Sequence, residues 1–152
     1  MAKRSGRDSD PFIVYNYELD LAGTVVGYFM EVSGIGSENE VVEHKVVSKD
    51  GREGVQKIPG RLKWENIVLK RGITDTLDMW EWRDLVVDGK MKDARKSCSI
   101  RMYDRNYELA AQWDIVNAWP SKISGPSGKS DGNDVGVEEL TLVHEGLKRV
   151  KV

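Results

Sequence analysis

The stretch IVYNYELDLAGTVVGYFM, residues 13–30, alternates between two kinds of side chain in its first half. One set is mainly apolar: Ile13, Tyr15, Tyr17, Leu19 and Leu21. The other set is mainly polar: Val14, Asn16, Glu18 and Asp20. A period of two is typical of a β-strand with one buried face. Because the small residues Ala22 and Gly23 precede a second apolar run at 24–30, the stretch predicts a β-hairpin and an antiparallel fold.

The same alternation recurs along most of the chain. It predicts further strands at 40–48, 61–70, 97–103, 107–116 and 135–145. Between the first two of these lies a glycine-rich charged stretch, Lys49–Gly54, which continues to Ile58-Pro59-Gly60 and is expected to be a loop. The sequence therefore predicts a mainly β domain.

One segment, 74–88, breaks the alternation. Met79, Trp82 and Val86 recur at helical spacing, Thr74 or Asp75 can cap the N-terminus, and Gly89 can end the helix. The pattern predicts one short amphipathic α-helix. Its other face is strongly acidic and carries a single Arg83; the acidic residues are Asp75, Asp78, Glu81, Asp84 and Asp88.

Length and charge set the class of protein. The 152 residues fit one domain, expected at 11–152, behind a disordered tail at 1–10 that has nothing apolar to bury. A net charge of −2 gives no general attraction to nucleic acid or to an anionic membrane. The basic start lacks the apolar run of a signal peptide, and no stretch is long enough to span a bilayer. We therefore expect a soluble protein made in a reducing compartment, with Cys98 as a buried small hydrophobe.

A possible nucleotide site, GPSGKS at 125–130, is rejected. A phosphate-binding loop needs a glycine where the chain has Ile123, and turn-forming residues follow instead of a helix. His44 and His144 lie on separate predicted strands without partners at metal-ligand spacing. We therefore expect no catalytic residues, no metal and no cofactor. Basic residues from Lys90 to Arg105 leave a weak nucleic-acid surface conceivable, but no recognised motif accompanies them.

Three of the five tryptophans fall at informative positions. Trp64 and Trp113 lie in alternating strands and are expected in the core. Trp80 lies on a different side of the helix from Trp82, which favours an interface.

Seven short motifs occur in an order that resembles the inner-tube protein of contractile tails, shared by myovirus tail tubes and extracellular contractile injection systems. They are Glu31–Ile35 (EVSGI), Lys57–Gly60 (KIPG), Asn66–Gly72 (NIVLKRG), Trp80–Trp82 (WEW), Ala118–Pro120 (AWP), Gly125–Pro126 and His144–Leu147 (HEGL). The resemblance covers roughly residues 11–150, and the glycine-rich turn after Pro126 departs from it.

The resemblance implies two packed antiparallel sheets that form a barrel-like sandwich with one short α-helix. It also implies a structural function: hexameric rings that stack into a conduit inside a sheath and pass DNA or protein into a target cell. Partners would be further copies, sheath, baseplate or spike, tail-terminator protein and cargo, in a virion tail or injection-system particle assembled in the bacterial cytoplasm. The alternative is an expelled ring protein of the type VI secretion kind that carries effectors.

Within this framework the sequence indicates two contact surfaces. The polar segment 48–58 is expected to join rings or subunits through Lys49, Asp50, Arg52, Glu53 and Lys57, because it is long for a hairpin connection. The acidic helix face is expected to meet the sheath. Glu43 and Lys45 alternate with Val42 and Val46. This alternation is expected in a tube wall that faces water on the inside and is packed on the outside.

Overall fold

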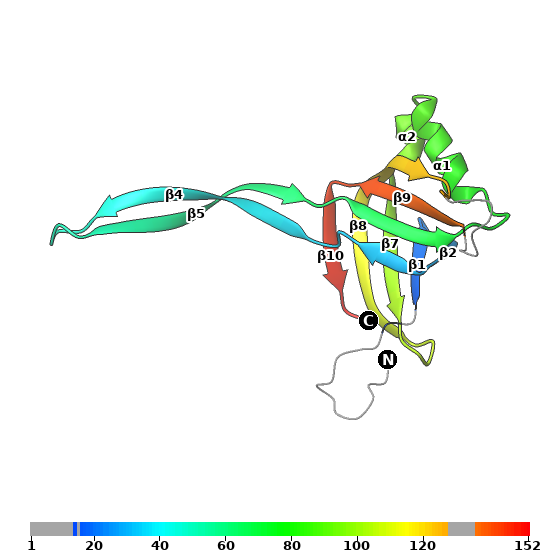
Figure 1. Cartoon of the computed structure of the whole chain (residues 1–152), viewed down its shortest axis with the longest axis horizontal. Coiled ribbons are helices and arrows are strands. Elements are labelled where there is room, and N and C mark those ends of the chain that lie inside the picture. The colour runs from blue at the N-terminus through cyan, green and yellow to red at the C-terminus, as the bar shows by residue number, and fades with distance from the viewer. Residues whose placement is uncertain (1–13, 15, 128–135) are drawn as a thin grey trace.

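Strands dominate the computed structural model, which describes residues 14, 16–127 and 136–152 (Figure 1). The elements are β1 (Asn16–Leu21), β2 (Thr24–Phe29), β3 (Glu31–Ser33), β4 (Ser37–Val47), β5 (Glu53–Trp64), β6 (Ile67–Gly72), α1 (Asp78–Val87), α2 (Met91–Ala94), β7 (Lys96–Tyr103), β8 (Leu109–Ser124), β9 (Val137–Val143) and β10 (Gly146–Val150). The mainly β class and the hairpin that opens the chain are confirmed.

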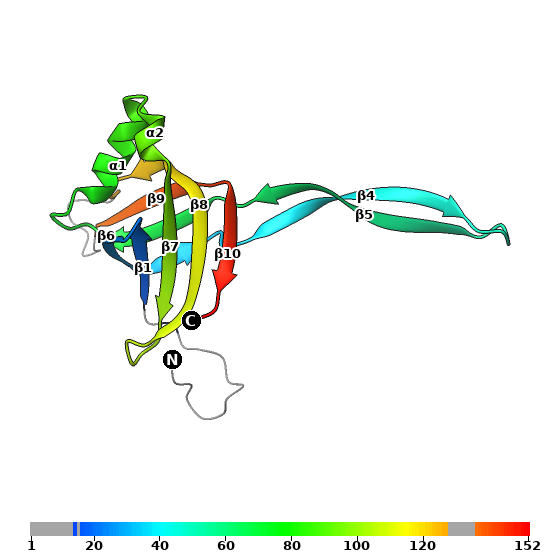
Figure 2. The same cartoon turned by 180° about the vertical axis from the view of Figure 1, so that it is seen from behind.

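The strands form two half-sheets that share the long strand β8. Half-sheet A has the order β2-β1-β7-β8-β10, and half-sheet B has the order β8-β9-β6-β3. At Met30 the chain passes from β2 in half-sheet A to β3 in half-sheet B, and the Met30 N–H donates to the Lys70 carbonyl at 2.9 Å. Figure 2 shows the two half-sheets crossing, with both helices together at one end. The expectation of two packed antiparallel sheets is confirmed.

The hydrophobic core lies between the half-sheets. Alternate residues of the strands point inward, such as Leu19 of β1, Ile100 of β7 and Leu140 of β9, each fully buried. From α1, Met79 and Trp82 close the core, and the Trp82 indole N–H donates to the Ala94 carbonyl at 2.7 Å. Cys98 is buried there as expected, and burial raises the pKa of its thiol to about 12.

A buried ion pair lies beside the core. The Arg71 Nε donates to Glu138 Oε1 at 2.9 Å, and the Trp80 indole N–H donates to Glu138 Oε2 at 2.8 Å. Glu138 is 1 % exposed and Arg71 6 %. Trp80, which the sequence placed at an interface, is thus bonded within its own chain, because a buried carboxylate needs more than one donor.

The expected loop at 49–60 is wrong. Most of it is β5, which pairs with β4 from Val47↔Glu53 to Ser37↔Trp64 and leaves only 48–52 as the turn. We call β4, this turn and β5 the arm. It projects from the half-sheets as a two-stranded ribbon (Figure 1). Gly51, at a φ of 75°, allows the tight turn, and Pro59 is tolerated because a two-stranded ribbon has free edges.

Other boundaries also differ from the expectation. The strand expected at 61–70 is split into the end of β5 and β6, the strand at 107–116 continues to Ser124, and the strand at 135–145 is two strands, β9 and β10. Glu43 and Lys45 lie on the arm, so they are not part of either half-sheet. The helix begins at Asp78 without a side-chain cap, and a second short helix, α2, follows.

Neither helix of the described residues has the length and apolar character that a membrane span requires.

Candidate assembly surfaces

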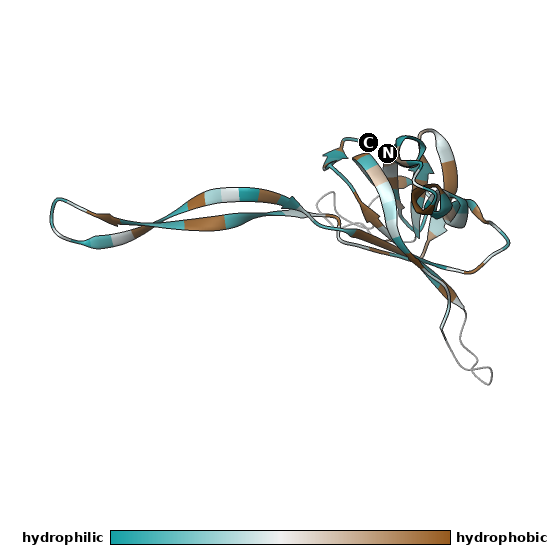
Figure 3. Ribbon diagram, turned by 90° about the horizontal axis from the view of Figure 1, so that it is seen from above, coloured by the Kyte–Doolittle hydropathy of each residue, from teal (hydrophilic) through white to brown (hydrophobic). Residues whose placement is uncertain are grey.

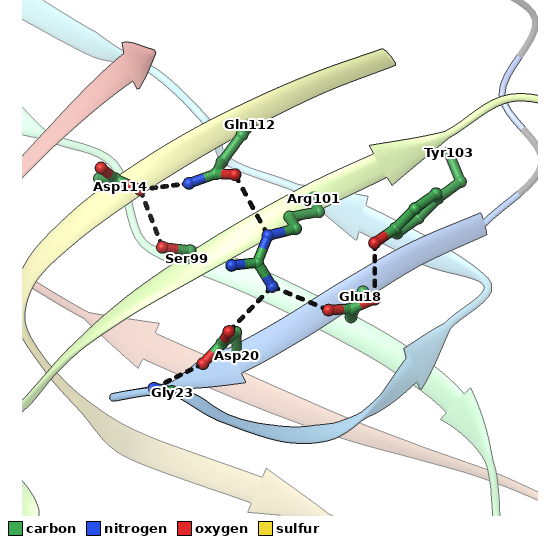
Figure 4. Close-up of polar contacts among 8 residues, drawn as sticks. All are labelled: Glu18, Asp20, Gly23, Ser99, Arg101, Tyr103, Gln112 and Asp114. Atoms are coloured by element: carbon green, nitrogen blue, oxygen red, sulfur yellow. Dashed lines mark hydrogen bonds and ion pairs between the residues drawn. The ribbon is translucent and has the colours of Figure 1, made fainter. Parts of the chain in front are cut away.

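A network of polar side chains covers the face of half-sheet A that points away from the core (Figure 4). We call it the polar ladder: Glu18, Asp20, Ser99, Arg101, Tyr103, Gln112 and Asp114. Strand register brings them together, because Glu18 lies opposite Arg101, which in turn lies opposite Gln112. The next row joins Asp20, Ser99 and Asp114 in the same way.

Arg101 is the centre of the ladder. Its Nη1 donates to Glu18 Oε1 and to Asp20 Oδ2, both at 2.8 Å, and its Nε donates to Gln112 Oε1 at 3.1 Å. Hydrogen bonding to Asp20 is the main reason that the pKa of Arg101 is raised. Its single positive charge is therefore shared between two carboxylates, and three hydrogen bonds fix the guanidinium in place.

The remaining members of the ladder are also hydrogen-bonded to ladder carboxylates. Gln112 and Ser99 both donate to Asp114 Oδ1, at 2.9 and 2.8 Å, and these two bonds lower the pKa of the Asp114 carboxyl. The Tyr103 hydroxyl donates to Glu18 Oε2 at 2.9 Å. Burial, then the bond to Glu18, raises the pKa of Tyr103 to about 12. Glu18 and Asp20, expected on a polar face, do lie there but are buried at 6 % and 9 % exposure.

Half-sheet A ends in two unpaired edges. In the described part of the chain, the outer edges of β2 and β10 have no strand partner within half-sheet A. Unpaired N–H and C=O groups of an edge are a template for another strand. Apolar side chains gather at the β2 edge on the ladder face, where Val25 is 46 % exposed and Tyr28 58 %.

The arm has two unlike faces, which follow from its register. We call one the uncharged face: Val42, His44, Val46, Gly54, Gln56 and Ile58. The opposite, charged face holds Val41, Glu43, Lys45, Val47, Glu53, Val55, Lys57 and Pro59. Figure 3 shows hydrophobic segments along the whole ribbon. Valines at about half to two-thirds exposure are unusual for a surface that stays in water.

Contacts at its root fix the arm to the half-sheets. The rings of Trp64 and His144 lie 5.7 Å apart, and His144 Nε2 is 3.1 Å from the Glu65 carbonyl oxygen. The Glu65 N–H donates to the Gly36 carbonyl at 3.2 Å. Trp64, expected in the core, is therefore half-buried at the root. Trp113 does pack against the core.

The five residues expected at a subunit contact all lie on the arm, and all are exposed. Lys49, Asp50 and Arg52 form the turn at its tip, while Glu53 and Lys57 follow on the charged face. The structure brings them together on one projecting element that lacks a core of its own.

The acidic face of α1 is exposed as expected. Asp78, Glu81 and Asp84 of the helix are exposed, as are Asp75 before it and Asp88 at its C-terminal end, whereas Met79 and Trp82 are buried. Arg83, the one basic residue of the helix, points back to the domain, and its Nη1 donates to the Pro120 carbonyl at 3.1 Å. The acidic face therefore has no basic neighbour on α1 itself.

The rejected nucleotide loop begins at an ordinary strand end. Ile123 belongs to β8 and packs against the core, and Gly125–Ser127 are exposed. Residues 128–130 of the motif lie outside the described residues.

Two of these surfaces escaped sequence reasoning. The ladder joins residues up to 85 positions apart, such as Glu18 and Tyr103, so only a strand alignment reveals it. The sequence of the arm did contain a pattern that favours strands, because the segments 41–47 and 53–59 mix valines with charges and contain few turn residues.

Comparisons with known proteins agree on the fold. A chain of the PVC sheath–tube complex, an extracellular contractile injection system in its extended state, is 22 % identical with a TM-score of 0.74, and 95 % of each chain is covered. A chain of the six-fold symmetrised anti-feeding prophage baseplate is 15 % identical, covers 93 % of this chain and 97 % of its own, and has a TM-score of 0.73. Hcp1 from Flavobacterium johnsoniae is 14 % identical over 89 % of this chain and 94 % of its own, with a TM-score of 0.56.

No curated protein is significantly similar in sequence to the chain. The family model described as T4-like virus tail tube protein gp19 matches residues 14–148, which is most of the chain. A fold of half-sheets with open edges and a projecting arm fits that match. The chain therefore belongs to the tail tube protein family of contractile tails, whose members are structural tube proteins and not enzymes.

Proposed function

We propose that six copies of this chain form a ring, that rings stack into a hollow tube inside a contractile sheath, and that the tube guides DNA or protein into a target cell. The proposal is supported above all by the two unlike faces and the open edges of half-sheet A. It has a core on one face, a bonded polar ladder on the other, and open edges on both sides. Such a sheet can be extended by neighbours into a closed wall, which removes its edges.

The ladder face is the one we assign to the bore. Five strands at a spacing of about 4.8 Å give an arc of roughly 24 Å per copy, so six copies enclose a bore about 45 Å across at the backbone. The ladder holds three carboxylates against one guanidinium, which is already bonded to two of them. With three carboxylates against one guanidinium, the ladder carries a net negative charge, so it would repel and not retain an anionic cargo.

The arm is proposed to join one copy to another. A two-stranded ribbon alone is marginally stable in water, so the arm gains its stability by packing on a neighbour. Its uncharged face supplies apolar surface through Val42, Val46 and Ile58, and the charges at its tip and on β5 are available for pairing. The contact predicted for 48–58 thus widens to the whole arm.

The arm proposal is tested by shortening Lys49–Gly54 to a two-residue turn. The domain should stay folded but build no tubes, because the tip contact is lost. Two double variants sharpen the test: Val42→Asp with Ile58→Asp on the uncharged face, and Val47→Asp with Val55→Asp on the charged face. The first pair should abolish tubes, and the second should weaken assembly less, because the charged face already meets its neighbour through polar groups. Normal tubes from the shortened chain or from the first pair would disprove the contact.

The acidic face of α1 is proposed to meet the sheath. Individual exposed ion pairs contribute about 0–1 kcal/mol, but a docking surface repeated along a tube multiplies them and still allows release. The ends of the tube would meet baseplate or spike and a tail terminator. Assembly would take place in the bacterial cytoplasm.

A triple variant, Asp78→Lys with Glu81→Lys and Asp84→Lys, tests the sheath contact. Tubes should form without a sheath, and the native tube–sheath complex should weaken with salt. The matched variant with Asn or Gln at the same positions should give an intermediate loss. Normally sheathed particles from the triple-Lys variant would exclude this face.

Electron microscopy of the purified chain tests the whole proposal. Long tubes with a bore are the expected result. Isolated rings would favour the expelled carrier related to Hcp, and monomers at every concentration would disprove both.

A further inference from the structure

We infer that Arg71, Glu138 and Trp80, which we call the buried cluster, are positioning residues. They fix where β2 and α1 lie relative to half-sheet B, and the pair of buried charges adds little net stability. The inference rests on the proposed function, because β2 and α1 carry surfaces that are proposed to meet partners. It concerns how those surfaces are held before a partner arrives.

Four elements meet at the buried cluster. Arg71 lies on β6, Glu138 on β9 and Trp80 on α1. Glu138 accepts from the Arg71 Nε at 2.9 Å and from the Trp80 indole N–H at 2.8 Å. On its other side Arg71 reaches β2, where its Nη1 lies 3.5 Å from the Val26 carbonyl oxygen and its Cζ lies 5.4 Å from the centroid of the Phe29 ring. The cluster thus connects the helix with a strand of the other half-sheet.

β2 is irregular at the point of contact. Its register with β1 shifts between Leu19 and Asp20, and Val26 is the extra residue of a β-bulge. A bulge bends its strand and leaves one residue out of the regular ladder. The next residue, Gly27, leaves room for the guanidinium, because a Cβ there would lie 2.6 Å from Arg71 Nη1. The shape of β2 and the place of Arg71 therefore depend on each other.

Stability alone does not explain these charges. Arg71 is 6 % exposed and Glu138 1 %, and among the described residues none accepts a hydrogen bond from the buried Arg71 Nη2. A buried pair with an unpaired donor recovers its desolvation cost incompletely. Apolar residues of similar volume often replace both members of such a pair without loss of stability. Removing one member is different, because it leaves the other charge buried alone.

The pair does provide direction. A guanidinium and a carboxylate bond in few relative orientations, and each has further hydrogen-bonding atoms for other elements. An apolar pair would fill the same volume but would bond neither the Val26 carbonyl nor the Trp80 N–H. β2 and α1 would then be held by packing alone, which tolerates shifts and loses uniqueness before it loses stability.

The test replaces both charges at once. The apolar variant, Arg71→Met with Glu138→Leu, should keep its urea midpoint within about 0.5 M of the native chain. Hydrogen exchange of the unassembled chain should nevertheless be about tenfold faster at the amides of β2 and α1. Amides of β10, the other outer strand of half-sheet A, are the control and should keep native rates, because β10 pairs with β8.

Two single variants separate the two connections. Arg71→Lys keeps a positive charge beside Glu138 but lacks the planar fork, so exchange should rise in β2 and not in α1. Trp80→Phe removes one donor to Glu138, so exchange should rise in α1 and not in β2. A purely stabilising role would instead speed exchange in all the most protected strands together.

Native exchange rates in β2 and α1 of the apolar variant would overturn the inference. A urea midpoint lowered by more than about 0.5 M, or a variant that does not fold, would overturn it as well, because the charges would then be needed for stability. Single variants that both speed exchange throughout the chain would do the same.

Tube formation is measured separately by electron microscopy over a range of concentrations. The apolar variant should need about tenfold more protein than the native chain, because only a fraction of its copies hold β2 and α1 in the assembling position. Tubes at the native concentration, together with fast exchange, would disprove the role in assembly. Native chain that forms no tubes would disprove the proposed function, whereas the exchange rates would still decide whether the cluster positions β2 and α1.

Discussion

The half-sheets and the arm are built from the same kind of alternating sequence but are stabilised differently. In half-sheet A, one side of the strands faces the core, and the other side of β1, β7 and β8 carries the bonded polar ladder, so Leu19 is fully buried and even Glu18 is only 6 % exposed. In the arm, Val41 and Val47 are more than 60 % exposed. Alternation therefore predicts a strand, but it does not say whether that strand is stable alone. The half-sheets have their core within one copy, whereas the arm has none.

The largest effect is expected from breaking the buried ion pair of the half-sheets. Glu138→Gln should lower the free energy of unfolding by about 3–5 kcal/mol, because it leaves Arg71 buried without a counter-charge. The control is Glu31→Gln, which removes the 3.8 Å ion pair of the adjacent Lys70. That exposed pair should contribute about 0–1 kcal/mol. Urea denaturation of the unassembled chain measures both, and equal losses would contradict the expectation.

The second-largest change in stability is expected from comparing one substitution in the core with one in the arm. Leu140→Ala should cost about 2–5 kcal/mol through the cavity it leaves between the half-sheets. Val42→Ala on the arm should change the unfolding of the unassembled chain by less than about 0.5 kcal/mol. If Val42→Ala destabilised the chain as much as Leu140→Ala, the arm would have a core that the monomer does not show.

The root and the tip of the arm each contain a glycine with a positive φ, and the two glycines should respond differently to substitution. Gly34 has a φ of 82°, and a side chain there would run into the Asn66 carbonyl. Gly51 has a φ of 75°, and a side chain there would meet nothing within 4 Å. Both substitutions carry the left-handed backbone strain of about 1–2 kcal/mol, and Gly34→Ala should cost clearly more than Gly51→Ala because it adds the clash with Asn66. Thermal unfolding of both variants checks this, and a reversed order would show that the tip is the more constrained site.

The smallest effect concerns the ladder at high pH. The pKa of Tyr103 is raised to about 12 in the folded chain, above the ordinary value of 10.0, so its contribution to stability is complete below pH 10 and is lost as the pH rises towards 12. Melting temperatures from pH 9 to pH 12 should fall more steeply for the native chain than for Tyr103→Phe. Tyr28→Phe, which removes an exposed hydroxyl, should behave like the native chain.

Local patterns predicted the strands and the helix face but not their partners. The spacing of Met79 and Trp82 identified the buried side of α1, and the alternation around Leu19 identified the core side of β1. The burial of Glu18 could not be predicted, because it depends on Arg101, 83 residues away.

The arm was misjudged for a different reason. A loop is usually recognised by its charges and glycines, and β5 contains both because no core selects against them. An irregular register between Asn39 and Val41 also interrupts the alternation of β4. A strand pair that has no core within its own chain therefore resembles a connection when one sequence is considered alone.

β8 has a mechanical consequence. Its 16 residues pair with β7 on one side and with β10 and then β9 on the other, so it belongs to both half-sheets. Separating the half-sheets under load would require shearing rows of hydrogen bonds along one continuous strand, instead of opening them one at a time. The domain should therefore move as a stiff block when a tube is pushed. The arm, which has no strand in either half-sheet, should be the part that bends.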